Sequence, residues 1–129
     1  MGFTYHGSFD GSEPIMQEFV VAADNTIAVG TLCILASGLA AVATTDSAAF
    51  VGVAVSAGGA GDTVSVIINP HAIYSVEDNN ARLAGATLDI ATGARGVAAS
   101  SNVDLVVTQG SSATQPTLVS IAAGEHYLT

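Results

Sequence analysis

The feature that most constrains the fold of this chain is the alternation of apolar and polar residues in short runs. Within residues 62–69, Val64 and Val66 alternate with polar neighbours, and the same pattern recurs in 86–91 and 103–108. A period of two places successive side chains on opposite faces of a β-strand, whereas an amphipathic helix has a period near 3.6. The alternation therefore predicts β-strands.

Gly, Asp, Asn and Ser separate these runs, and all four residue types favour turns. We expect strands near residues 18–23, 29–35, 39–44, 50–56, 62–69, 72–77, 86–91, 103–108 and 117–122. The only helical turn that the pattern allows is at 80–84. Many short strands at this spacing are typical of a small barrel or sandwich. The expected fold is therefore all-β, with at most one short helix.

A weak internal repeat supports this fold class. Residues 30–38 resemble residues 85–93, and each segment is an apolar run that begins and ends at a glycine. The copies differ by one-residue shifts, which a β-bulge can absorb. The alternative is chance similarity in a chain that is built from few residue types.

The N-terminal 18 residues differ in composition from the rest. Phe3, Tyr5 and Phe9 lie among Gly, Ser and Asp, without a sustained period. A segment so short and rich in glycine does not fold alone, so its aromatic side chains need a surface on which to dock. We therefore divide the chain into an extended N-terminal arm, 1–18, and a β-rich domain, 19–129. The alternative is that the arm adds a strand to its own body or to a sister subunit.

The charge of the chain limits the class of partner. It has eleven acidic residues and only two basic ones, Arg82 and Arg95, which gives a formal net charge of −9. Binding to nucleic acid or to an anionic membrane requires Lys and Arg, so we expect neither partner. A surface with few charges is poorly solvated, and we expect neighbouring subunits to cover much of it.

Candidate catalytic and metal-binding residues are sparse. The glycine cluster at 58–61 is followed by no Lys and reads as a hairpin turn, and His6, His71 and His126 do not have metal-ligand spacing. With no Lys and two Arg, little besides backbone amides could stabilise an oxyanion or a phosphoryl group. The single cysteine, Cys33, lies among apolar residues and is expected to be a buried thiol. We therefore expect no enzyme activity, no cofactor and no metal.

Two segments bear on location. Residues 26–45 carry no charge and are about long enough to span a bilayer, but Gly, Thr and β-branched residues dilute them and no Lys or Arg flanks them. Residues 1–18 have no positively charged region of the kind that begins a signal peptide. We expect neither a membrane helix nor a secretory signal.

Several runs together carry a family resemblance. After the N-terminal segment come aliphatic runs interrupted by glycine or aspartate, at 19–24, 28–32, 50–54 and 61–66. This arrangement, over roughly residues 15–80, resembles the small capsid decoration (cement) proteins of tailed phages, of the lambda head-decoration type.

The resemblance implies a β-tulip-like body, often a homotrimer, on the outer capsid surface of a virion after synthesis in the host cytoplasm. Its partners would be the major capsid protein, whose neighbouring subunits it ties together, and further copies of itself. The N-terminal segment would become ordered on the capsid. Five of its residues are the expected capsid-interface residues: Phe3, Tyr5, Phe9, Ile15 and Met16.

Two other functions stay open. One is another virion component, such as a head fibre or tail protein, which should have a longer repeat or shaft-like sequence. The other is a small β-barrel domain that binds a ligand or hydrolyses a substrate, which would need a convergent polar pocket.

Overall fold

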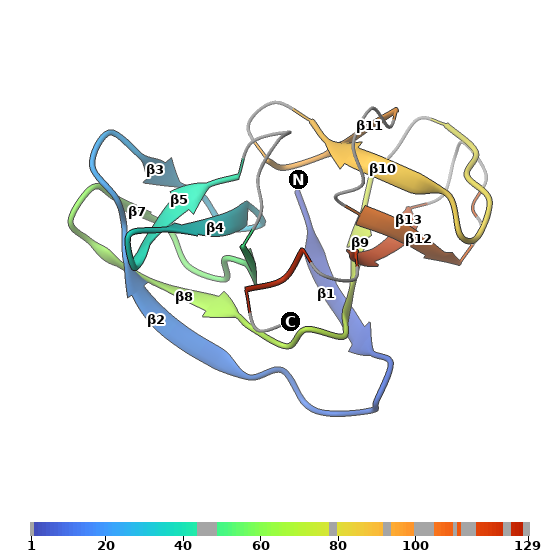
Figure 1. The fold of residues 1–129 in the computed structure, drawn as a ribbon, viewed down its shortest axis with the longest axis horizontal. Coiled ribbons are helices and arrows are strands. Elements are labelled where there is room, and N and C mark those ends of the chain that lie inside the picture. The colour runs from blue at the N-terminus through green and yellow to red at the C-terminus, as the bar shows by residue number, and fades with distance from the viewer. Residues whose placement is uncertain are drawn as a thin grey trace.

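The computed structural model describes residues 2–43, 49–77, 80–91, 94–99, 105–109, 111, 116–122 and 125–127. Within these ranges the chain is all-β and has no helix (Figure 1), which confirms the expected fold class. Residues 80–84, where a helical turn was allowed, contain a bend and a β-bridge between Arg82 and Ser111. The strands are β1 (Thr4–Ser8), β2 (Met16–Val20), β3 (Thr26–Ile27), β4 (Leu32–Ala36), β5 (Leu39–Val42), β6 (Phe50–Val53), β7 (Gly58–Gly59), β8 (Thr63–Ile67), β9 (Ala72–Val76), β10 (Thr87–Ile90), β11 (Val97–Ala99), β12 (Leu105–Gln109) and β13 (Thr117–Ile121).

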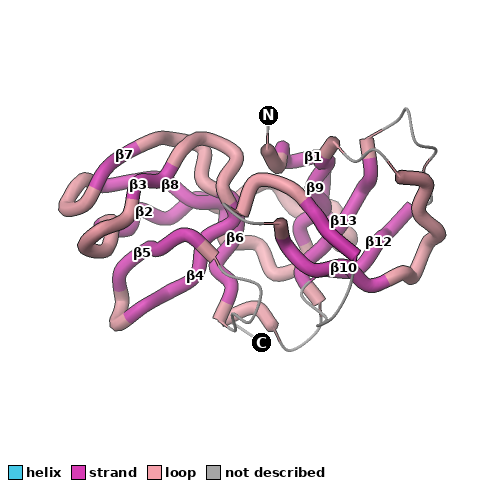
Figure 2. Tube along the Cα trace, turned by 90° about the horizontal axis from the view of Figure 1, so that it is seen from above, coloured by secondary structure: helices cyan, strands magenta, loops and turns pink. Residues whose placement is uncertain are grey.

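The later part of the chain, together with β1, forms a six-stranded antiparallel sheet in the order β1-β9-β13-β12-β10-β11. Alternate residues of β9 and β12 are buried, as the period of two predicts. In Figures 1 and 2 this sheet forms one side of the molecule, and β2 to β5, β7 and β8 form the other.

The earlier part forms a small barrel. β2 pairs with β8, and β4 pairs with both β5 and β6. A bridge between Ala54 and Val66 joins β6 to β8, and a bridge between Val21 and Ala40 joins the end of β2 to β5. These pairings take the strands around a closed circuit, β2-β8-β6-β4-β5. The short strands β3 and β7 form a separate ribbon.

The two halves have the same topology. Apart from the β3–β7 ribbon, the strands of each half, numbered in chain order, lie in space in the order first, fifth, fourth, second, third. This order is β2-β8-β6-β4-β5 in one half and β9-β13-β12-β10-β11 in the other. The repeated segments hold equivalent strands, β4 and β10. Before each strand a glycine, Gly30 or Gly85, has a φ of +88° or +85°, which favours glycine. This agreement favours a true repeat over chance similarity.

The core has two parts. One cluster fills the barrel and includes Phe19, Cys33 and Val51. The other packs the six-stranded sheet against the barrel and includes Phe3, Phe50 and Leu105. The second cluster draws residues from both halves and so packs them against each other.

Residues 2–18 belong to this body in the structure. Phe3 is 3% exposed, and its N–H donates to the carbonyl of Gly30 (2.9 Å). β1 pairs along β9, and Tyr5 lies edge-on to Tyr74 with the ring centroids 6.4 Å apart. The proposed boundary at residue 18 falls inside β2. The structure therefore corresponds to the alternative stated above, in which the segment adds strands to its own body, and attachment to a capsid stays a prediction.

Candidate interaction surface

The structure separates the five predicted interface residues into two groups. Phe3 is in the core, and Tyr5 is half-buried with its ring edge-on to Tyr74. Phe9, Ile15 and Met16 are 63%, 57% and 57% exposed. We call these three residues the apolar ridge. They lie on the connection between β1 and β2 and at the start of β2.

A buried asparagine fixes one end of this connection. The side-chain oxygen of Asn69 accepts a hydrogen bond from the N–H of Ile15 (2.6 Å), and its amide nitrogen donates to the carbonyl of Glu13 (2.9 Å). The same nitrogen donates to the hydroxyl of Ser12 (3.2 Å). Because an asparagine in a buried position must satisfy its donors and acceptor, these bonds hold the loop in one shape.

An exposed aspartate fixes the other end. The carboxylate of Asp10 accepts hydrogen bonds from the hydroxyls of Ser12 and Ser8 (2.6 Å each) and from the N–H of Ser12 (3.0 Å). The bonds from Ser12, and then that from Ser8, hold the pKa of Asp10 well below its usual range. The loop therefore carries a fixed negative charge beside the apolar ridge.

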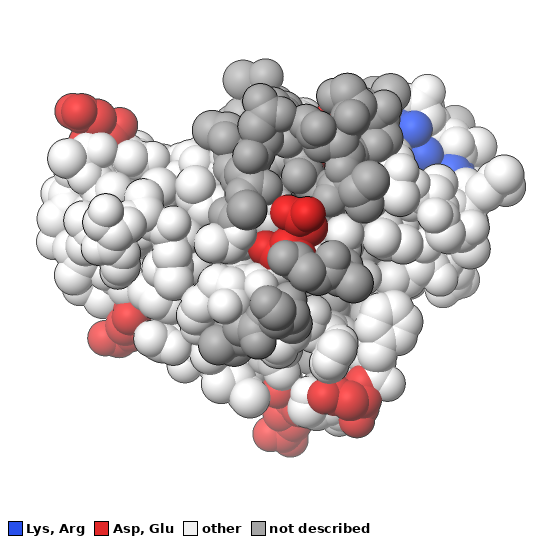
Figure 3. Space-filling view, in the orientation of Figure 1, with Lys and Arg blue, Asp and Glu red and all other residues white. Residues whose placement is uncertain are grey.

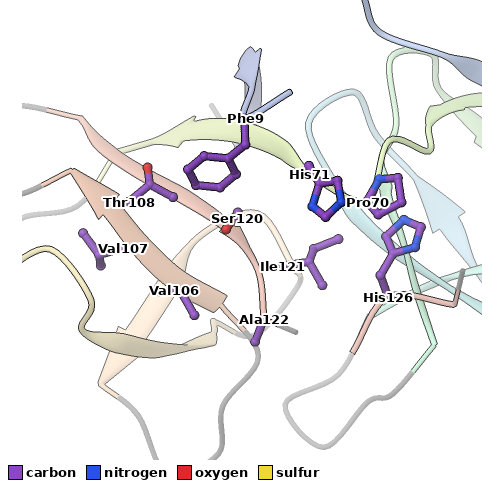
Figure 4. A pocket seen from close by; sticks show the side chains of 10 residues that line it. All are labelled: Phe9, Pro70, His71, Val106, Val107, Thr108, Ser120, Ile121, Ala122 and His126. Atoms are coloured by element: carbon purple, nitrogen blue, oxygen red, sulfur yellow. The ribbon is translucent and has the colours of Figure 1, made fainter. Parts of the chain in front are cut away.

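A groove of about 420 Å³ adjoins Phe9 (Figure 4). In this view Thr108 of β12 lies on one side, His71 and His126 lie on the other, and Phe9 and Ser120 of β13 lie between them. The N–H of Phe9 donates to the carbonyl of His71 (3.1 Å), which anchors the aromatic ring at the edge of the groove. The groove is mainly apolar, and it meets the ridge at Phe9.

His126 is a buried polar residue at the end of this groove. Its Nε2 lies 2.8 Å from the carbonyl oxygen of Val51, and the ring is stacked on Tyr127 with the centroids 5.0 Å apart. Burial lowers the pKa of His126, although the hydrogen bond to Val51 opposes this shift. The neutral imidazole, which donates from Nε2, is therefore the form that the folded protein favours.

This burial predicts a loss of stability on mild acidification. The unfolded histidine titrates near its ordinary pKa of about 6.5. Below that pH the unfolded chain takes up a proton that the folded protein resists, so the contribution of His126 is present above pH ~6.5 and falls by up to about 1.4 kcal/mol per pH unit below it. Denaturant unfolding at pH 7.5 and 5.5 should give a difference between the parent and His126→Gln that shrinks at pH 5.5. The exposed His6→Gln variant is the control, and an equal difference at both values would contradict the prediction.

Other chemically capable groups do not converge in the part of the chain that the structure describes. No three His, Cys, Asp or Glu side chains there are grouped so that they could hold a metal ion. Cys33 is buried, as predicted, and burial raises the pKa of its thiol to about 12. Among the described residues, no helix is long and apolar enough to cross a bilayer.

The sequence did not reveal the residues that support the ridge. Asn69 precedes Pro70, a pair that indicates a turn, but its partners Ser12, Glu13 and Ile15 are 54 to 57 positions away in the chain. His126 likewise contacts Val51 across 75 positions. Only the fold brings these residues together.

No protein-family model matches the chain, and no curated protein matches it. Among solved structures, its fold is similar to that of the head fiber gp8.5 N base in bacteriophage phi29, with a TM-score of 0.59. The sequence identity is 17%, and the alignment covers 86% of this chain and 98% of that chain. At this identity the likeness concerns the fold.

Proposed function

We propose that this chain is a non-enzymatic structural protein of a phage virion, a decoration (cement) protein that binds the outer surface of the head and stabilises contacts between major capsid subunits. The apolar ridge is the observation that carries the proposal. The sequence resemblance to decoration proteins and the fold similarity to a phage head fibre base support a place on the head.

The physics of the ridge suits attachment to a repeating surface. Burial of each large apolar side chain contributes about 1.5–3 kcal/mol before the cost of association is subtracted. The hydrogen bonds that Asn69 and Asp10 accept fix the shape of the loop before binding. This lowers the entropy cost of ordering the loop when it binds. Contacts of this size are weak singly, and several copies of the ridge in one oligomer would strengthen them through effective concentration.

The remaining parts of the proposal concern partners. The major capsid protein is the first, and a second copy of the chain, in a homotrimer, is the other. The net charge of −9 disfavours nucleic acid and anionic membrane. The protein would be made in the host cytoplasm and would act on the assembled head.

The base of a head fibre is the second candidate function, because the likeness covers 98% of the head fibre base. Cross-linking of purified virions separates the two candidates. A decoration protein should cross-link to two neighbouring capsid subunits and occur in numbers comparable to the capsid lattice. A fibre base should occur at few positions and should cross-link to a fibre.

Removal of the ridge tests the proposal. The triple variant Phe9→Ala, Ile15→Ala, Met16→Ala should bind heads that lack the protein at least tenfold more weakly in a sedimentation assay, since hot-spot truncations each cost about 1–2 kcal/mol or more. Its melting temperature should stay within a few degrees of the parent, because exposed positions contribute little to stability.

The control variant removes exposed apolar side chains that lie elsewhere on the surface. Val29 and Leu83 are also large, apolar and exposed, but they lie outside the ridge. The double variant Val29→Ala, Leu83→Ala should bind as the parent does. Unchanged binding of the triple variant would refute the role of the ridge.

A further inference from the structure

The outer edge of β2 has backbone groups that pair with no strand among the described residues. The N–H of Ile68 donates to the carbonyl of Ile15 (2.9 Å), and the N–H of Val21 donates to the carbonyl of Asp62 (2.8 Å). In an antiparallel ladder, hydrogen-bonded residues alternate with residues whose peptide groups point the other way. The odd-numbered residues of β2 therefore bond to β8, and the peptide groups of Met16 and Glu18 point away from it.

No described strand covers this edge at Met16 and Glu18. β8 is the only strand in the sheet with β2, and β5 meets the chain beyond it, at Val21. In Figure 1, β2 runs along the lower margin of the molecule with β8 above it. In the part of the chain that the structure describes, this edge is therefore unpaired, and it begins at Met16 of the apolar ridge.

The equivalent edge in the other half carries an added strand. β2 and β9 are the first strands of the two repeats, and each pairs with the last strand of its own half, β8 or β13. The outer edge of β9 is covered by β1, which pairs antiparallel to it from Ser75 to Ala72. In the second half, the fold therefore already pairs an extended segment, β1, with the edge that corresponds to the unpaired edge of β2.

The chemistry along the open edge is acidic and apolar. Glu18 is exposed and shares a face with Met16, because residues two apart in a strand point to the same side. Asp10 and Glu13 are exposed on the preceding loop. In Figure 3, acidic side chains lie along the lower margin, over the β1–β2 connection, and the basic atoms visible on this face lie at the opposite margin.

A second copy of the chain cannot supply a lysine to this edge, because its only basic residues are Arg82 and Arg95. Both lie on other elements: the guanidinium of Arg95 donates to the carbonyl of Val29 (2.9 Å), and the backbone of Arg82 pairs with Ser111. We therefore take a different protein, and not a second copy, as the source of a cation opposite Glu18. Opposite charges across two strands stabilise the pair, and like charges destabilise it.

We propose that the edge of β2 at residues 16–18 accepts an extended segment of the shell subunit as an antiparallel strand, with a Lys or Arg of that segment opposite Glu18 and an apolar residue opposite Met16. This inference rests on the proposed function, since it names the element of the shell that the protein would bind. Main-chain hydrogen bonds would supply affinity, and the Glu18 pair would set the register.

Hydrogen exchange at single-residue resolution tests the edge. In the free protein the amides of Met16 and Glu18 should exchange quickly, while those of Gln17 and Phe19, which bond to β8, should exchange slowly. On heads, the amides of Met16 and Glu18 should slow at least tenfold. Protein that sediments with heads but keeps fast exchange at both residues overturns the edge and leaves the proposed function standing. Protein that does not sediment with heads overturns both.

Charge reversal gives a second, independent readout. Glu18→Lys should weaken binding to heads at least tenfold, whereas Glu77→Lys, the same charge change at an exposed position after β9, should change it less than twofold. Circular dichroism checks that both variants fold. Equal losses for the two variants would indicate a general effect of net charge and would overturn the pairing at Glu18.

Discussion

A protein that begins at Phe19 is expected to lose its folded structure. Removal of residues 1–18 deletes β1 from the edge of the six-stranded sheet, takes Phe3 out of the core, and shortens β2 to two residues. Loss of one buried phenylalanine side chain costs about 3–5 kcal/mol. Since domains are stable by only about 5–15 kcal/mol, the loss of Phe3 together with the pairing of β1 removes most or all of that stability.

Circular dichroism and thermal unfolding measure this effect, and two phenylalanines of the same segment provide the matched comparison. Phe3→Ala should lower the free energy of unfolding by about 3–5 kcal/mol, because Phe3 is buried. Phe9→Ala should change it by less than about 0.5 kcal/mol, because Phe9 is exposed. A truncated protein that keeps the parent spectrum and melting temperature would show instead that residues 1–18 form a separable arm.

The sequence predicts the strands of the body well, and the reason is the period of two. Each expected strand overlaps an observed one, and in strands such as β9 and β12, which have one face on the core, the alternation records that burial. β1 was not predicted, since its residues are polar or glycine except for Tyr5 and its position at the sheet edge leaves a weak pattern. The strands β3, β7 and β11 were also not predicted, because two or three residues are too few for any periodicity.

The candidate site was predicted only in part, because exposure depends on tertiary pairing. Phe3 and Phe9 are chemically identical and six positions apart, but the first packs beneath the sheet and the second stands at the edge of a groove. Composition identifies both as residues that need a surface. The pairing of β1 with β9, which no local pattern encodes, decides that Phe3 finds its surface within the chain.

The second large effect is expected at Gly52, in strand β6 of the barrel. A methyl group at this position would overlap the carbonyl oxygen of Ile67 and would lie 3.1 Å from the hydroxyl of Tyr74. The φ of Gly52 is +148°, a conformation that residues with a Cβ rarely adopt. Only glycine lets β6 pack this closely against the end of β8.

Gly52→Ala should therefore destabilise the protein by about 3 kcal/mol or more, because the neighbouring atom is backbone and cannot rotate away. At this chain length that corresponds to a fall in melting temperature on the order of 10 °C, measurable by thermal unfolding. The fall should not depend on heads or on any partner, since Gly52 is buried inside the fold.

Two other glycines separate the contributions of space and of backbone conformation. Gly38 has a φ of +81° with nothing within 4 Å of an added Cβ, so Gly38→Ala should cost only the conformational strain of about 1–2 kcal/mol. Gly7 has open space and no positive φ, so Gly7→Ala should be close to neutral. If Gly52→Ala were no worse than Gly38→Ala, β6 and β8 could move apart at little cost. The close contact at Gly52 would then not be what holds β6 against β8.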